Sequence, residues 1–138
     1  RARTGAARED EIVPLRALLD AGVHVALATD NVPPSLFHPI WQAVARRDRY
    51  SGRVIAPGQR LSREEALRAA TIEGAYLTLE EGEKGSLEPG KLADLVVLSD
   101  NPMTCHEARI KDITAEMTIV GGRIVHSVPG TILAGPTT

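Results

Sequence analysis

The sequence predicts an α/β fold made of two regions with different patterns. Residues 11–81 alternate amphipathic helices with one short strand, whereas residues 85–127 are mostly β-like. The chain has 138 residues, of which 43% are hydrophobic, which is typical of a globular domain. Only 3% are aromatic, so the core is expected to consist mainly of Leu, Val, Ile and Ala.

Apolar residues at helical spacing predict two helices before residue 52. Residues 1–10 are polar and are expected to be frayed, and the first helix then runs from Ile12 to its end at Gly22. The second helix is expected to begin at Pro39 and to end near residues 50–52. Its buried face is expected to contain Ile40, Trp41, Val44 and Ala45. The arginines near its end, at positions 46, 47, 49 and 53, are expected to be solvated and to complement the helix dipole.

A third helix is expected from residue 62 to residue 77. Ser62 and Glu65 have the spacing of a capping box, in which each side chain accepts a hydrogen bond from the backbone N–H of the other residue. Gly74 lies inside this helix, where glycine costs about 1 kcal/mol relative to alanine. We therefore expect another backbone to pass close to Gly74.

The second region consists of strands separated by turns. A strand is predicted over residues 92–98, and residues 102–112 are expected to form a loop with one helical turn. A hairpin is predicted over residues 118–126, because the pair Gly121–Gly122 suits the positive φ angles of a two-residue hairpin turn.

A short run of β-forming residues, 23–29, ends in Asp30. Because side chains alternate along a strand, every second one from Val23 to Thr29 would pack under helices, while the opposite face is small and ends in Asp30. Such a face suits the interior of a closed (β/α)8 barrel, where catalytic residues lie at the carboxyl ends of the strands. The alternative is that Asp30 caps the following turn. His24 lies about 20 Å away along the strand and is interpreted as a core or barrel-floor residue.

Four segments, in this order, resemble the carboxyl-terminal part of a metal-dependent hydrolase of the amidohydrolase superfamily. The resemblance is closest to amidohydrolase family 3, which includes N-acyl amino acid deacylase-like enzymes. Residues 25–30 (VALATD) resemble the eighth barrel strand, and residues 39–47 (PIWQAVARR) the helix after it. Residues 61–75 resemble the helix that leads out of the barrel. Residues 85–98 (GSLEPGKLADLVVL) resemble the characteristic strand pair of a small β-sandwich domain, and residues 121–126 its closing hairpin.

This resemblance implies a division of the chain. Residues 1–81 would be the carboxyl-terminal end of a TIM (β/α)8 barrel, comprising its last strand and the following helices. Residues 82–127 would be part of a composite β-sandwich domain, and residues 128–138 a disordered tail. An eight-stranded barrel takes about 250 residues. We therefore expect this chain, which starts at Arg1 rather than Met, to be a piece of a longer protein.

The resemblance also implies a role for Asp30. In the superfamily, the Asp that ends the eighth strand contacts the metal site and takes the proton of the attacking water. Asp30 would thus be both the catalytic proton shuttle and a metal ligand, and the cofactor would be a divalent metal, with zinc expected first. The sequence has no His-x-His pair, and its four histidines lie in separate segments. Because a catalytic metal site usually needs three protein ligands, the chain alone is expected to be inactive.

Three further residues are candidates for contact with substrate: Asn31, Ser35 and His38. They follow Asp30 in a loop that, in a barrel, would lie over the mouth of the active site. For His38 the alternative is a helix-start or solvent role. The implied function is hydrolysis of a carbon–nitrogen bond, a non-peptide amide, in a small molecule. The alternatives are a deaminase or cyclic-amide hydrolase of the same superfamily, and a non-catalytic binding or assembly module.

Charge and composition narrow the expected partners. The net charge of −2 gives no field that recruits nucleic acid or an anionic membrane, and no apolar run approaches the roughly 18 residues of a membrane span. The expected partner is a small-molecule amide substrate, and a homo-oligomer is a further expectation. A single cysteine cannot form an internal disulfide, which favours a cytoplasmic location, with any signal peptide lying upstream of Arg1.

Overall fold

The computed structural model describes residues 6–30 and 35–130, which combine short helices with a small antiparallel sheet. The α-helices of this part are α1 (Leu15–Asp20), α2 (Phe37–Ala45), α3 (Arg63–Ala70) and α4 (Ile72–Leu77). The strands are β1 (Leu95–Leu98), β2 (Ala115–Val120) and β3 (Arg123–Ser127). Short 3-10 helices cover Ala6–Glu11, Pro57–Gln59 and Glu107–Asp112. The mixed α/β class is therefore confirmed. The expected frayed start is wrong for residues 6–10, which belong to a 3-10 helix with a kink at Arg8.

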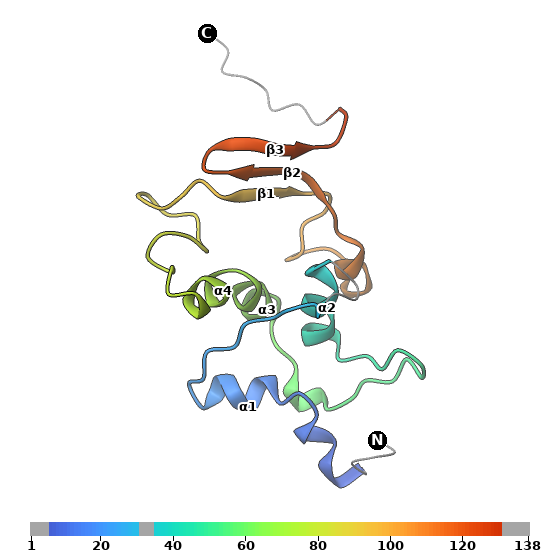
Figure 1. Ribbon diagram of the computed structural model, residues 1–138. Helices are drawn as coiled ribbons and strands as arrows, with labels where there is room; N and C mark the ends of the chain where they lie inside the picture. The colour runs from blue at the N-terminus through green and yellow to red at the C-terminus, as the bar shows by residue number, and fades with distance from the viewer. Residues whose placement is uncertain (1–5, 31–34, 131–138) are drawn as a thin grey trace.

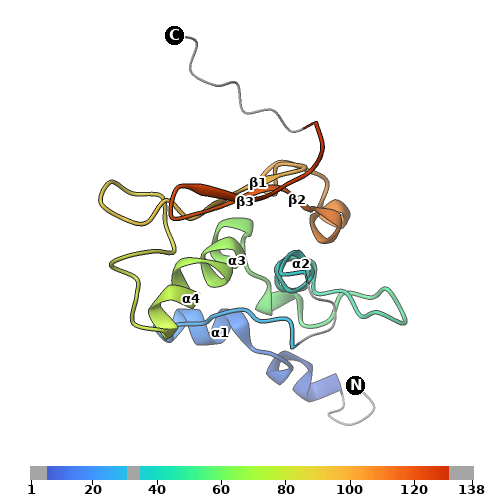
Figure 2. The same cartoon turned by 45° about the horizontal axis from the view of Figure 1, so that its top comes forward.

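The helices and the sheet form two layers. Figure 1 shows the sheet above the helices, with β1 nearest to them and β3 farthest away, and Figure 2 shows the same layers from a second direction. The strands pair in the order β1-β2-β3, and both pairs are antiparallel. Every residue of β3 is exposed, because no other described element covers either of its faces. No helix in the described ranges is long and apolar enough to cross a membrane.

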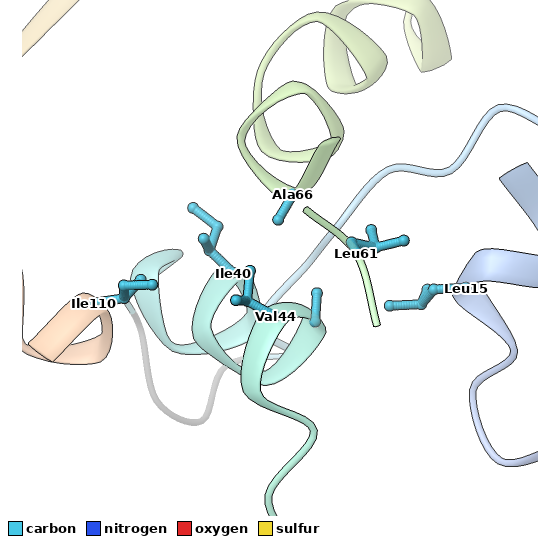
Figure 3. Close-up of a cluster of buried hydrophobic side chains, with 7 residues drawn as sticks. Leu15, Ile40, Val44, Leu61, Ala66 and Ile110 are labelled. Atoms are coloured by element: carbon cyan, nitrogen blue, oxygen red, sulfur yellow. The ribbon is translucent and has the colours of Figure 1, made fainter. Parts of the chain in front are cut away.

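A small aliphatic core joins α1, α2 and α3 to the 3-10 helix Glu107–Asp112. Figure 3 shows these side chains converging from four separate segments. Phe37 and Trp41 pack against the cluster only at its border. The expected core of Leu, Val, Ile and Ala is thus confirmed, whereas Trp41, which is expected on the buried face of its helix, is only half-buried. The cluster consists of Leu15, Ile40, Ala43, Val44, Leu61, Ala66 and Ile110.

The capping box at the start of α3 is confirmed. Glu65 N donates to Ser62 Oγ at 3.1 Å, and Ser62 N donates to Glu65 Oε2 at 2.7 Å. The single helix expected over residues 62–77 is wrong, because the chain breaks at Thr71 (φ −127°, ψ −90°). The Thr71 hydroxyl donates to Leu67 O at 2.8 Å. This side-chain hydrogen bond competes with the backbone hydrogen bonds of a continuous helix.

Glu65 also links α3 to α1, because its carboxylate pairs with the Arg16 guanidinium. This hydrogen bond, together with that from Ser62 N, lowers the pKa of Glu65 from 4.5 to about 2. A depressed carboxyl pKa contributes stability that is present above the unfolded-state pKa and is lost as pH falls toward the folded-state value. Between pH 4.5 and pH 2, we expect the free energy of unfolding of the wild type to fall by about 0.5–1 kcal/mol more than that of Glu65→Gln. The expected difference is small because the ion pair is partly exposed. Urea titrations at several pH values measure this difference, and parallel curves would contradict it.

Gly85, rather than Gly74, is the glycine at a close approach. A Cβ at Gly74 would meet nothing within 4 Å, so that expectation is wrong. A Cβ at Gly85 would lie 2.8 Å from Ala75 Cβ and 2.9 Å from Ile72 Cα, and the residue has φ +91°. Gly85 therefore lets the segment after α4 return directly against that helix.

The hairpin around Gly121 and Gly122 is confirmed, with φ of +56° and +76° at the two glycines. The preceding strand is shorter than expected, since β1 begins only at Leu95. Of the expected disordered tail, Val128 still pairs with the sheet, because its N–H donates to Glu116 O at 2.8 Å. The rest of that prediction, over residues 131–138, lies outside the described residues.

Candidate functional site

The segment that carries Asp30 lies across the helical layer. Residues 23–29 form no strand ladder with any described residue, so the expected strand is not present here as such. Its alternation follows the prediction from Val25 onward, where Val25, Leu27 and Thr29 are half-buried and the residues between them are exposed. Val23, which is expected on the same face, is exposed. Leu27 N donates to Ala69 O at 2.9 Å, which ties the middle of the segment to α3.

Asp30 ends this segment with its side chain exposed and its backbone at φ +51°. The left-handed region is uncommon for residues other than glycine, although Asp and Asn enter it more readily than most. Both the turn interpretation and the catalytic one remain compatible with this geometry. The carboxylate is accessible to a small molecule, as a proton acceptor must be.

His24 lies at the opposite end of the segment, and its interpretation as a core residue is wrong. Its side chain is 54% exposed, and its Nδ1 lies 2.7 Å from Glu73 Oε2. Its ring stacks on Tyr76, with centroids 3.7 Å apart and planes 17° apart. His24 thus joins the beginning of the segment to α4, and its structural rather than catalytic role is supported.

The loop candidates lie at the start of α2, except for Asn31, which lies outside the described residues. Phe37 N donates to Ser35 Oγ at 3.2 Å, and His38 N donates to Ser35 O at 3.2 Å. The His38 ring meets the edge of Trp41 at a centroid distance of 5.6 Å. Ser35 and His38 therefore stabilise the helix start. Contact with substrate stays a prediction for all three.

Arg46 is buried, so the expectation of a solvated arginine is wrong at this position, although Arg47, Arg49 and Arg53 are exposed as expected. Helix α2 stops at Ala45, and Arg46 turns the chain with φ +53°. Its guanidinium donates to Ile12 O at 2.6 Å, to Val13 O at 3.0 Å and to Ile55 O at 3.3 Å. Burial lowers the pKa of Arg46, while the nearby Asp10 opposes that shift. The Arg46 guanidinium thus links backbone carbonyls that lie before and after α2 in the sequence. No local pattern in the sequence indicates this role.

A cavity of about 550 Å³ lies beside the arginine. Its walls come from the segment before α1, from α2, from the turn at residues 46–55, and from residues 27 and 28 just before Asp30. This cavity was not predicted, because it arises where segments distant in sequence meet. Apolar groups dominate its lining, among them Val13, Leu27, Ala28, Pro39, Ala43 and Ile55.

Within the described residues, no group of three or more His, Cys, Asp or Glu side chains could hold a metal ion. Asp30 can offer one carboxylate, and the histidines of this part are engaged elsewhere or lie on other elements. The residues described here therefore do not make up a metal centre.

Comparisons with known proteins point to one family. The sequence profile of the amidohydrolase family matches residues 1–126. An N-substituted formamide deformylase from Arthrobacter pascens is 36% identical over 115 residues, which cover 81% of this chain and 21% of that protein. An imidazolonepropionase from Porphyromonas gingivalis is 35% identical over 120 residues, covering 85% of this chain and 26% of that protein. The crystal structure of an amidohydrolase from Thermotoga maritima superimposes with a TM-score of 0.62 at 26% identity, over 83% of this chain and 26% of the other. The chain thus spans about a quarter or less of the length of these relatives.

Proposed function

This chain belongs to the amidohydrolase family, and from that membership we propose that the protein containing it hydrolyses a carbon–nitrogen bond, an amide, in a small molecule. The observation that carries the proposal is the exposed Asp30 at the end of an alternating segment, inside the region that the family profile matches. The names of the relatives support it, since one is a deformylase of N-substituted formamides.

We further propose that residues 1–81 are the end of a (β/α)8 barrel and residues 82–127 part of a composite β-sandwich. Two features support this division. The half-buried and exposed residues alternate from His24 to Asp30 without a strand partner, and β3 is exposed on both faces. An extended segment without a partner is what an edge strand shows when its neighbouring strand lies elsewhere in the protein. A strand exposed on both faces lacks the layer that would cover it in a sandwich. A cytoplasmic location and a homo-oligomer stay predictions.

In the proposed reaction Asp30 acts as a proton carrier. Its carboxylate accepts a proton from the attacking water and passes it to the leaving nitrogen as the carbon–nitrogen bond breaks. Amidohydrolases generally use divalent metals, which lower the pKa of bound water toward neutrality. Zinc is the proposed metal, and its remaining ligands would have to come from residues other than those described.

The test is an amide panel assayed with the intact protein, including N-alkylformamides, a cyclic amide and an aminopurine as a deaminase substrate. We expect turnover of amides, and a loss on the order of 100-fold after treatment with a chelator, because activation of water depends on the metal. Zinc should restore the rate, with manganese and cobalt as the comparison metals. A panel without any turnover, in a protein that contains stoichiometric metal, would favour the non-catalytic module instead.

A further inference from the structure

We propose that the 3-10 helix Glu107–Asp112, which belongs to the second region of the chain, positions His38 for contact with the substrate. It acts through Trp41 on α2. The inference rests on the proposed function, because it takes His38 as a substrate contact beside the reacting Asp30. It gives the second region a part in substrate binding through contacts that this chain makes with itself.

The packing of α2 on the 3-10 helix is the first argument. Helix α2 begins at Phe37, seven residues after Asp30. It packs more extensively against the 3-10 helix Glu107–Asp112 than against α3. Ile110 of that 3-10 helix is fully buried, and Figure 3 shows it beside Ile40 and Val44 of α2. A residue of the second region thus sets where this face of α2 lies.

Trp41 carries the contact onward to His38. Its ring packs at the border of the cluster that contains Ile110, and Lys111 Nζ lies 6.0 Å from the ring centre, at the outer limit of a cation–π contact. The His38 ring meets the edge of the same indole, with centroids 5.6 Å apart. Among the residues that the structure describes, the buried Nε1 of Trp41 has no hydrogen-bond partner. Packing rather than a hydrogen bond therefore fixes the direction of the indole.

The His38 side chain is available to a ligand. It is half-buried, and neither of its ring nitrogens forms a hydrogen bond with any residue in the described ranges. A neutral imidazole has one donor and one acceptor nitrogen, so it can bind either polar atom of an amide. Because the contact with Trp41 sets the direction of this ring, a change of packing at Ile110 should reach the substrate through His38.

Asp30 is held by a different contact. The hydrogen bond from Leu27 N to Ala69 O, at 2.9 Å, ties its segment to α3. Loss of packing at Ile110 should therefore weaken substrate binding more than it slows proton transfer by Asp30. In kinetic terms KM rises while kcat stays constant, which is the signature of lost binding shared by ground state and transition state. A loss of stability alone would lower kcat through the fraction of folded enzyme and would leave KM unchanged.

Ile113 supplies a matched control three residues further along the chain. Ile110 and Ile113 are 0% and 3% exposed, but only Ile110 belongs to the core cluster that includes α2. Ile110→Ala and Ile113→Ala remove the same atoms from buried sites, so both should lose stability. Ile110→Val and Ile113→Val form a milder pair, which removes a single methylene-sized group and replaces the alanine pair if either alanine variant does not fold.

The intact protein and its variants are assayed with the best amide of the panel. We expect Ile110→Ala to raise KM about fivefold while kcat stays within twofold, since one hydrogen bond to an uncharged group is worth a factor of this size. Ile113→Ala should leave KM unchanged. His38→Phe keeps an aromatic ring against Trp41 but has no ring nitrogen. Added to His38→Phe, Ile110→Ala should raise KM no further, because residues that act through one contact are not additive.

Three kinetic results would overturn the positioning role. They are an equal rise of KM in the variants of Ile110 and Ile113, a fall of kcat without a rise of KM, and a full effect of Ile110→Ala in the His38→Phe background. In each case the second region would support the fold without acting on the substrate through His38.

A readout that needs no turnover separates this inference from the proposed function. In the intact protein labelled with 5-fluorotryptophan, the fluorine resonance of Trp41 is assigned by its loss in Trp41→Phe. It should shift in Ile110→Ala and stay in place in Ile113→Ala. Turnover of amides with an unshifted resonance in Ile110→Ala would overturn the positioning role and leave the hydrolase proposal intact. The expected shift, in a protein that hydrolyses none of the amides but binds one with an affinity that Ile110→Ala weakens, would keep the positioning role and remove the hydrolase proposal.

Discussion

Asp30→Asn is expected to lower kcat of the intact protein by about 10³-fold, within the range that general acid–base catalysis contributes. The amide of Asn has nearly the shape of the carboxylate but cannot accept a proton from water. Asn also enters the left-handed region as readily as Asp, so φ +51° at this position is no obstacle to the variant. The variant should therefore keep its fold, with an unchanged Tm and circular dichroism spectrum. The measurement is kcat with the best amide of the panel.

The control for this variant is Asp112→Asn, which removes an exposed carboxylate far along the sequence from the segment that carries Asp30. It should keep a wild-type rate. Asp30→Ala is less informative, because alanine is strained at a positive φ and a loss of activity could then follow from a loss of structure. A wild-type rate in Asp30→Asn would reduce Asp30 to a turn residue and remove the proton-shuttle role.

Gly85→Ala is expected to cost the protein about 2–5 kcal/mol in free energy of unfolding. Two effects add. Alanine at φ +91° adopts a backbone conformation that L-residues disfavour by about 1–2 kcal/mol. Its methyl group would also overlap Ala75 Cβ and the backbone of Ile72, and overpacking of this kind costs about 1–3 kcal/mol. Because one of the atoms is backbone, the collision cannot be relieved by a change of rotamer.

Gly90→Ala separates the two effects. Gly90 has almost the same φ, +94°, but a Cβ there would meet nothing within 4 Å. It should therefore show the backbone cost alone, and the difference between the two variants in urea unfolding reports the contact with α4. Equal losses in both variants would mean that the segment at residue 85 does not pack on α4 as described.

Features fixed by neighbouring residues were predictable from the sequence. The capping box needs only Ser62 and Glu65, three residues apart, and it forms as expected. The hairpin needs two adjacent glycines that tolerate positive φ, and it too forms. Alternation from His24 to Asp30 survives even without a strand partner, because the helical layer buries one side of the segment. Family membership was predictable for a similar reason, since it rests on local motifs in a fixed order.

Features that depend on residues far apart were not predictable. Nothing near Arg46 indicates that its guanidinium will be buried, because its acceptors at Ile12 and Val13 lie more than thirty residues earlier. The end of α2 was placed too late for the same reason, since the left-handed turn at Arg46 positions that side chain toward those carbonyls. Periodicity favoured Gly74 as the close approach, but only the return of the chain onto α4 assigns it to Gly85.

Sequence patterns were enough to predict the capping box of α3, the hairpin, the aliphatic character of the core and the place of Asp30 at the end of an alternating segment. Local hydrogen bonds and side-chain alternation act over a few residues, so their patterns are visible in the chain. The burial of Arg46, the exposure of His24 and the hollow beside Arg46 arise only in the folded chain. These features follow from contacts between segments that are far apart in the sequence. Whether such segments meet depends on how the whole helical layer packs, and no short stretch of sequence indicates that packing.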